Sequence, residues 1–202
     1  MNREEKKKAI HEMILGKPLI KSISWLQKEF GIGFTLAAEI YFEHNLDYVK
    51  RYLERGNRYL SINYNAVNKG VYGLEDYIKE LMVKLVQKKE RFPDNKIEWV
   101  EEYQIEITKF IIKVLECGIK ILKPDLYKSE AQSIIVDYDK RTLLMPISIK
   151  GISKQTAELI TVEREKEPFR SLEDLRRRCF IGIYGMASID KYSIFVAPIK
   201  DI

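Results

Sequence analysis

A change in the spacing of apolar residues at Gly118 divides the sequence into two parts. Before this glycine, apolar residues recur at the three- and four-residue intervals of helices that bury one face. After it, short β-branched runs alternate with turn residues and are followed by further helical segments. The pattern predicts a mainly α protein with an α+β C-terminal part.

Glycines, prolines and capping residues set the limits of the predicted elements. In the first part we expect helices at residues 3–15, 25–30, 34–42, 46–53, 74–92 and 97–118, with Ser24 as N-cap of the second helix and the last two as an antiparallel pair. In the second part we expect strands at 119–122, 133–136 and 143–149, a hairpin turn at 137–140, and helices at 154–166 and 171–178. Ser171 supplies the N-cap signal of the last helix.

The stretch from Arg58 to Tyr72 has few helical features. Residues 59–64 alternate loosely like a strand, and the asparagines and glycines that follow favour turns. We therefore place a domain boundary there and predict three units, at residues 1–68, 69–118 and 119–202.

The composition is that of a folded protein with a small positive charge. Hydrophobic residues make up 46% of the chain, and 35 Lys and Arg stand against 30 Asp and Glu, a net charge of +5. This hydrophobicity excludes disorder, whereas the positive excess suits nucleic acid but also many surfaces that bind nothing. No apolar run is long enough to span a bilayer and no signal-peptide core follows the N-terminus, so we expect a soluble, cytoplasmic protein without membrane contact.

The sequence predicts no metal site, no cofactor and no catalytic centre. Cys117 and Cys179 lack the spacing of metal ligands, and both histidines are isolated. Asp137 and Asp139 have the spacing of a metal-binding pair, but aspartate also favours turns, and both fall in the predicted hairpin turn. We therefore expect a protein that is not an enzyme. A nuclease ranks third among the possible functions, behind DNA binding and the docking of another protein.

The segment from Lys150 to Ile160 has the pattern of a phosphate-binding turn. Gly151 lies in a turn that opens a helix, where backbone N–H groups without internal partners and the positive end of the helix dipole favour an anion. Lys150 and Lys154 flank this point, and Ile152 anchors the turn in the core. We expect contacts with phosphates rather than base edges, so that binding is largely independent of DNA sequence.

This segment resembles a helix-hairpin-helix motif, whose hairpin is usually glycine, an apolar residue and glycine; Ser153 takes the place of the second glycine. The flanking stretches are similar to the duplex-contacting C-terminal region of bacterial DNA polymerase III alpha subunits of the PolC type. The similar stretches are residues 118–131, with Asp-Leu-Tyr-Lys-Ser at 125–129, and residues 167–178, with Ser-Leu-Glu-Asp-Leu at 171–175. This resemblance covers about residues 114–178. It implies DNA binding without polymerisation, since nothing in the chain matches the catalytic palm.

Residues 9–17 and 23–40 resemble the winged-helix gamma domain of FtsK-type DNA translocases. This resemblance implies that residues 1–68 form a winged-helix-like domain with a recognition helix in the major groove and a wing at residues 59–64. The recognition helix differs from the pattern of that family in two ways: an arginine expected near Leu36 is absent, and Glu39 adds a negative charge. For this domain, DNA contact, protein docking and a purely structural role all stay open.

Together these patterns predict a non-catalytic protein that binds duplex or junction DNA. The expected contacts are Lys150, Gly151, Ile152, Ser153, Lys154, Gln155, Thr156, Arg176, Arg177 and Arg178, with Lys28 and Thr35 from the N-terminal domain. The alternative is an interaction module that docks a replication protein and no longer binds DNA. Ser153 and the weak helical character of residues 144–147, just before the hairpin, favour this alternative.

Overall fold

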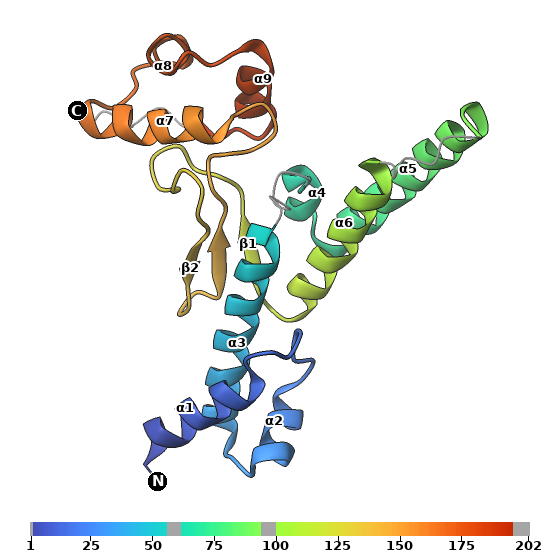
Figure 1. Ribbon diagram of the computed structural model, residues 1–202, viewed down its shortest axis with the longest axis vertical. Helices are drawn as coiled ribbons and strands as arrows, with labels where there is room; N and C mark the ends of the chain where they lie inside the picture. The colour runs from blue at the N-terminus through green and yellow to red at the C-terminus, as the bar shows by residue number, and fades with distance from the viewer. Residues whose placement is uncertain (1, 56–61, 94–99, 196–202) are drawn as a thin grey trace.

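The computed structural model describes residues 2–55, 62–93 and 100–195, which form a mainly helical protein with one small sheet (Figure 1). The first elements are the helices α1 (Arg3–Ile14), α2 (Ile23–Phe30), α3 (Phe34–Glu54), α4 (Tyr64–Asn68), α5 (Gly70–Arg91) and α6 (Val100–Glu116). The sheet strands β1 (Lys120–Leu122), β2 (Ile135–Asp137) and β3 (Thr142–Leu144) follow, and then the helices α7 (Lys154–Lys166), α8 (Leu172–Cys179) and α9 (Ile183–Lys191). The predicted class, mainly α with an α+β C-terminal part, is confirmed. No described helix is both long and apolar enough to cross a membrane.

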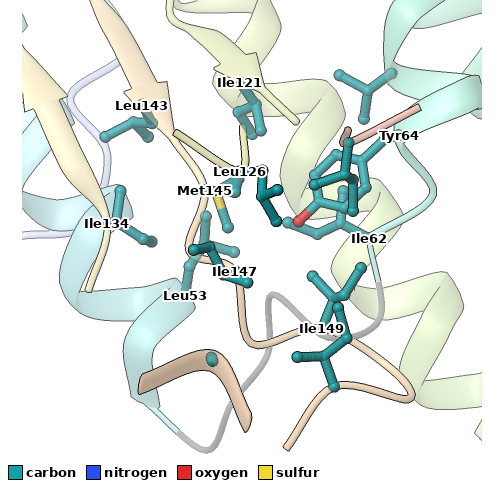
Figure 2. Close-up of a cluster of buried hydrophobic side chains, with 14 of the residues drawn as sticks. Leu53, Ile62, Tyr64, Ile121, Leu126, Ile134, Leu143, Met145, Ile147 and Ile149 are labelled. Atoms are coloured by element: carbon teal, nitrogen blue, oxygen red, sulfur yellow. The ribbon is translucent and has the colours of Figure 1, made fainter. Parts of the chain in front are cut away.

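The long helix α3 connects two apolar cores (Figure 1). Its first half buries Ala37 and Ile40 in a small core shared with α1 and α2. Its second half buries Val49 and Leu53 in a larger core that continues beneath the sheet to α9. Figure 2 shows the centre of this larger core, where Leu53, Ile62, Tyr64, Ile121, Leu126, Ile134, Leu143, Met145, Ile147 and Ile149 converge.

The prediction of two helices at 34–42 and 46–53 was wrong, because α3 is continuous. Neither glycine nor proline separates the two segments. Asn45, which is fully buried, accepts a hydrogen bond from the Ile20 N–H at 2.9 Å and donates one to the Ile20 carbonyl at 3.0 Å. Both polar ends of this side chain are therefore satisfied by a segment outside α3, so the side chain does not compete for the helix backbone and the asparagine does not end the helix.

The start of α2 also differs from the prediction. Its N-cap is Ser22, whose hydroxyl oxygen accepts a hydrogen bond from the Trp25 N–H at 3.1 Å, so the helix begins two residues earlier than a cap at Ser24 would require. The connector to α3 is confirmed. Gly31 ends α2 in the left-handed conformation with φ of 57°, and Gly33 is the N-cap of α3.

The stretch predicted as a strand and turns is mostly helical in the part that the structure describes. Asn63 caps α4 by accepting a hydrogen bond from the Ala66 N–H at 3.2 Å, and α5 begins at Gly70. Of the proposed wing at residues 59–64, residues 59–61 lie outside the described residues and Tyr64 is the first residue of α4. The described residues contain the expected N-terminal helices, but the winged-helix assignment is not confirmed. The division into three units, at residues 1–68, 69–118 and 119–202, stays a prediction.

The helices α5 and α6 form the predicted antiparallel pair, which projects from the body of the protein (Figure 1). Lys88 and Lys89 near the end of α5 contact Glu101 and Glu102 at the start of α6, each at 2.6 Å. Towards the other end of α6, Ile107, Ile111 and Val114 are buried in the larger core. The predicted residue Ile97 lies outside the described part.

The sheet has the strand order β1-β3-β2 and contains the predicted hairpin. Strands β2 and β3 are antiparallel, with Val136 opposite Leu143, and β1 lies parallel to β3. The expected strand at 143–149 was too long, because β3 ends at Leu144. Pro146 has no N–H to donate to a strand ladder, while residues 145–149 stay buried and lead directly to the turn at Gly151.

Candidate nucleic-acid interface

Three short helices, α7, α8 and α9, form a layer at one end of the protein (Figure 1). The turn that precedes α7 consists of Lys150, Gly151, Ile152 and Ser153, and we call it the first hairpin. Gly151 has φ of 91°, a conformation that side chains other than glycine rarely adopt. Ile152 is 3% exposed and anchors the turn in the core, as predicted. Residues 145–149 before this hairpin are buried and do not form a helix, in line with the weak helical character of 144–147 in the sequence.

Ser153 has a local structural role at the start of α7. Its hydroxyl oxygen accepts a hydrogen bond from the Thr156 N–H at 3.1 Å and lies 2.9 Å from the Thr156 hydroxyl. The first backbone bond of this helix runs from the Ala157 N–H to the Ser153 carbonyl. Ser153 is therefore an effective N-cap, and its replacement of a glycine does not distort the helix start.

Backbone N–H groups at the start of α7 remain open to a ligand. Among the described residues, the N–H groups of Ser153, Lys154 and Gln155 have no acceptor, and all three residues are exposed. Lys150 and Lys154 are also exposed, and neither has an ion-pair partner in the described part of the chain. No acidic residue occurs from Lys150 to Ala157. This arrangement can accept a phosphate, because N–H groups and cationic side chains converge on one exposed helix start.

The first hairpin packs directly on the start of α9. A Cβ atom on Gly151 would lie 2.6 Å from the Tyr184 carbonyl oxygen and 2.9 Å from the Gly185 nitrogen. In the reverse direction, a Cβ atom on Gly185 would lie 2.7 Å from the Gly151 carbonyl oxygen. The Ser188 hydroxyl donates a hydrogen bond to the Lys150 carbonyl at 2.6 Å. Gly151 is therefore required both for its backbone conformation and for this close approach.

The sequence prediction missed α9 and with it a second hairpin, Phe180, Ile181 and Gly182, between α8 and α9. Phe180 is left-handed with φ of 52°, Ile181 is 3% exposed, and Gly182 is the N-cap of α9. This order repeats the first hairpin: a left-handed residue, a buried isoleucine and a capping residue. The signal was present in the sequence as an Ile-Gly pair followed by Met186 and Ile189 at helical spacing.

The segment at 125–129, which resembles the polymerase family in sequence, connects α7 to the part of the chain that follows β1. The Arg164 guanidinium on α7 donates hydrogen bonds to the Leu126 and Ser129 carbonyls, each at 2.7 Å. The Tyr127 hydroxyl donates to the Phe169 carbonyl at 3.1 Å. Asp125 closes the segment as a turn by accepting from the Tyr127 N–H at 2.9 Å. These hydrogen bonds therefore hold α7, and with it the first hairpin, in position.

The three predicted arginines of α8 have different surroundings. The Arg178 side chain is 15% exposed; it contacts Glu163 at 3.3 Å and Asp174 at 3.4 Å and lies over the Phe169 ring at 4.5 Å. The Arg177 side chain is 77% exposed and contacts Asp174 at 3.1 Å. Arg176 is also exposed, with Glu173 3.9 Å away. Arg178 is thus engaged inside the layer, whereas Arg176 and Arg177 face solvent.

The acidic partners of Arg178 are stabilised as carboxylates. A hydrogen bond from the Arg170 N–H, with further bonds from Arg177 and Arg178, holds the pKa of Asp174 below its ordinary value. Hydrogen bonds from Lys166 and Arg178 lower the pKa of Glu163 in the same way. Both groups are therefore ionised at neutral pH and available to hold Arg178.

The two predicted contacts in the N-terminal domain lie far from the hairpins. Lys28 is exposed near the end of α2, and Thr35 is exposed at the start of α3. Figure 1 places α2 at the opposite end of the protein from α7. The structure therefore brings together the predicted residues 150–156, but it does not bring Lys28 and Thr35 to them.

The aspartates of the β-hairpin form a turn, as interpreted from the sequence. The Asp137 carboxylate accepts a hydrogen bond from the Lys140 N–H at 2.9 Å. In residues 2–55, 62–93 and 100–195, no group of three or more His, Cys, Asp and Glu side chains is placed to hold a metal ion. Burial raises the pKa of the Cys179 thiol to about 11, which keeps it protonated as a core residue.

Residues 118–189 match the family model described as a helix-hairpin-helix motif. This part of the chain, which we call the helix-hairpin-helix region, is thus similar to that motif. It contains the sheet, the 125–129 segment and both hairpins. The family match does not reach residues 9–40, and the resemblance of those residues to FtsK-type translocases is not supported.

The chain is also similar to curated proteins named DNA polymerase III PolC-type. The protein from Streptococcus agalactiae is 32% identical over 120 residues, which are 59% of this chain and 8% of that protein. The protein from Ureaplasma parvum is 30% identical over 95 residues, which are 46% of this chain and 7% of that protein. The predicted relation to this polymerase family is thus confirmed as partial similarity, and the chain spans less than a tenth of the length of these relatives.

Proposed function

We propose that the protein binds DNA without strong sequence preference through the helix-hairpin-helix region, and that the first hairpin holds a phosphate of the DNA backbone. The observation that carries this proposal is the exposed start of α7, where the N–H groups of Ser153, Lys154 and Gln155 have no acceptor among the described residues. Lys150 and Lys154 add positive charge at the same point. The family match and the name of the partial relatives support DNA as the source of the phosphate.

Arg176 and Arg177 extend the proposed contact surface. Both are exposed, and the Phe180 and Ile181 N–H groups of the second hairpin donate to the Arg176 carbonyl. Their charges would neutralise further phosphates beside the hairpins. Arg178 belongs to the interior of the layer in this proposal, because its guanidinium already has two carboxylate partners.

We further propose that the protein contacts DNA without catalysing its synthesis or cleavage. The similarity covers 8% of the Streptococcus agalactiae polymerase and 7% of the Ureaplasma parvum polymerase. We therefore do not assign polymerase activity to this protein. Incubation of end-labelled DNA with the protein and Mg²⁺ or Mn²⁺ tests this part directly. Metal-dependent cleavage or extension of the label would contradict it.

Fluorescence anisotropy with a labelled duplex, measured over a range of salt concentrations, tests the binding function. The logarithm of the affinity should fall linearly with the logarithm of the salt concentration, because each neutralised phosphate releases counterions. Lys154→Glu should weaken binding by about tenfold and reduce the magnitude of the slope by about 1. Lys8→Glu is the matched control: it makes the same charge change at an exposed position of α1, at the opposite end of the protein.

The outcomes distinguish DNA binding at the first hairpin from the docking of a replication protein. Equal weakening by Lys154→Glu and Lys8→Glu would indicate a general charge effect and would contradict a site at the first hairpin. Absence of DNA binding at any salt concentration would leave docking of a replication protein as the function of this region. Lys28→Glu and Thr35→Ala extend the same assay to the N-terminal helices.

A further inference from the structure

The second hairpin carries a cluster of apolar side chains that are almost fully exposed. Tyr184 is 85% exposed, Phe180 84% and Ile183 76%. Among the described large hydrophobic residues, only Tyr72 on α5 reaches comparable exposure, at 82%, and it stands apart from this cluster. Single exposed apolar residues are ordinary, but three within one turn and the first residues of a helix mark an interaction surface.

The two rings of this cluster are free to stack on a ligand. Among the described residues, neither Phe180 nor Tyr184 contacts another aromatic ring or a cation, although such contacts occur elsewhere in the protein. The Tyr184 hydroxyl has no hydrogen-bond partner in the described part of the chain. The fold holds both rings outward, because Ile181 between them is buried and Gly182 caps α9.

The charge around this cluster favours an anionic partner. The Tyr184 and Gly185 backbone contacts Gly151, so the cluster is continuous with the proposed phosphate contact. No acidic residue occurs from Leu175 to Ile189, a span that includes Arg176 and Arg177. Proteins bind unpaired nucleotides with exposed aromatic rings beside cationic side chains. The bases stack on the rings, and the positive charges hold the phosphates.

We propose that Phe180 and Tyr184 stack on unpaired bases, so that the protein prefers DNA in which a single strand adjoins a duplex over continuous duplex. This inference rests on the proposed function, because the first hairpin holds the adjacent backbone. A phosphate contact alone does not distinguish the two forms of DNA, whereas a free base face is available to the rings only where pairing ends. Ile183 contributes apolar contact beside the rings.

Anisotropy with two labelled DNAs, a blunt duplex and the same duplex with a single-stranded overhang, tests the inference. The wild-type protein should bind the overhang DNA about tenfold more tightly than the blunt duplex. The double variant Phe180→Ala/Tyr184→Ala should lose this difference while it keeps the affinity for the blunt duplex. Both side chains are exposed, so the variant should fold, and circular dichroism verifies this. The conservative variant Tyr184→Phe should keep the preference, and Tyr72→Ala, which removes an equally exposed ring, should also keep it.

The results distinguish failure of this inference from failure of the proposed function. Equal affinity of the wild-type protein for both DNAs would overturn the inference and leave the DNA-binding function intact. A preference that survives in the double variant would overturn the role of the rings. Absence of binding to either DNA would contradict the proposed function itself. A change from dimer to monomer in the double variant by sedimentation equilibrium, without an overhang preference in the wild type, would assign the cluster to self-association and overturn stacking.

A direct readout of stacking completes the test. An overhang that contains 2-aminopurine loses fluorescence when an aromatic ring stacks on the modified base. Quenching by the wild-type protein and by Tyr184→Phe, but not by the double variant, is the expected result. Equal quenching by all three proteins would contradict contact between the rings and the base.

Discussion

The backbone of Gly151 lies against the backbone of Tyr184, so closely that a Cβ atom on Gly151 would come within 2.6 Å of the Tyr184 carbonyl oxygen. This contact joins the first hairpin to α9, the helix that follows the second hairpin. Because a side chain at position 151 would separate them, loss of DNA binding in a Gly151 variant would not by itself identify a lost DNA contact. Variants of Lys154, which is exposed, are more informative.

Gly151→Ala should lower the free energy of unfolding by about 2 kcal/mol or more. The substitution places a side chain where φ is 91° and where the Tyr184 carbonyl leaves no room for it. Urea denaturation followed by circular dichroism measures the change. Gly16→Ala is the control: no atom would lie within 4 Å of its Cβ, so its effect should stay within about 0.5 kcal/mol. Equal stability of the two variants would contradict the described packing of the hairpins.

Arg178→Ala and Arg177→Ala should have opposite consequences. Arg178→Ala removes the partner of Glu163 and Asp174 and uncovers the Phe169 ring, so it should lower the thermal unfolding midpoint clearly. Arg177→Ala should leave the midpoint nearly unchanged, because an exposed ion pair contributes little. In anisotropy with duplex DNA, Arg177→Ala should weaken binding and reduce the salt slope. A stable Arg178→Ala protein with weakened DNA binding would assign Arg178 to the DNA contact instead.

Asn45→Ala should destabilise the N-terminal helices by about 2 to 4 kcal/mol. The variant leaves the Ile20 N–H and carbonyl without their partner in a buried position, and each unsatisfied group costs roughly 1 to 3 kcal/mol. Chemical denaturation monitored by Trp25 fluorescence, in a background that replaces the second tryptophan, Trp99, by Phe, reports on this core. Asn68→Ala, at an exposed position of α4, should change the stability by less than about 0.5 kcal/mol. A neutral Asn45→Ala variant would mean that these backbone groups find other partners.

The attachment of α1 to α3 should weaken in acid. A hydrogen bond from Lys7, with further help from Arg3, holds the pKa of Glu39 below its ordinary value of 4.5. A carboxylate whose pKa is lowered in the folded state stabilises the fold above the ordinary value, and this contribution is lost as the pH falls through the lowered pKa. Glu39→Gln should therefore reduce the free energy of unfolding at pH 7 by up to about 1 kcal/mol.

Comparison of the Glu39→Gln and wild-type proteins by urea denaturation at several pH values measures this dependence. The difference between them should disappear well below pH 4.5, where Glu39 itself becomes protonated. A difference that stays constant across the whole pH range would show that the glutamate acts through packing and not through its charge.

Elements with strong local signals could be predicted from the sequence. The helix at 154–166 has the predicted bounds, Ser171 caps α8 as expected, and the hairpin turn at 137–140 joins the two predicted strands. The turn before α7 could also be predicted locally, since a glycine, an apolar isoleucine and flanking lysines lie within five consecutive residues; its binding of phosphate stays a prediction. Local backbone preference and apolar periodicity determine such features, so no knowledge of the tertiary structure was needed.

The features that were missed depend on contacts between distant residues. The continuity of α3 relies on Asn45 and Ile20, which are 25 positions apart. Arg164 and Arg178 resemble exposed helix cations in the sequence, but they bind backbone or acidic groups brought to them by the fold. The second hairpin was missed because Phe180 occupies a left-handed position where a glycine would be expected.

A titration of the ¹⁵N-labelled protein with duplex DNA, followed by amide NMR, tests the central claim most directly. The amide signals of Ser153, Lys154 and Gln155 should show the largest shifts, because these N–H groups would become hydrogen bonded to a phosphate. Signals from α1 and α2 should change little. Unchanged signals from these three residues in the presence of saturating DNA would contradict the claim that the first hairpin holds the DNA backbone.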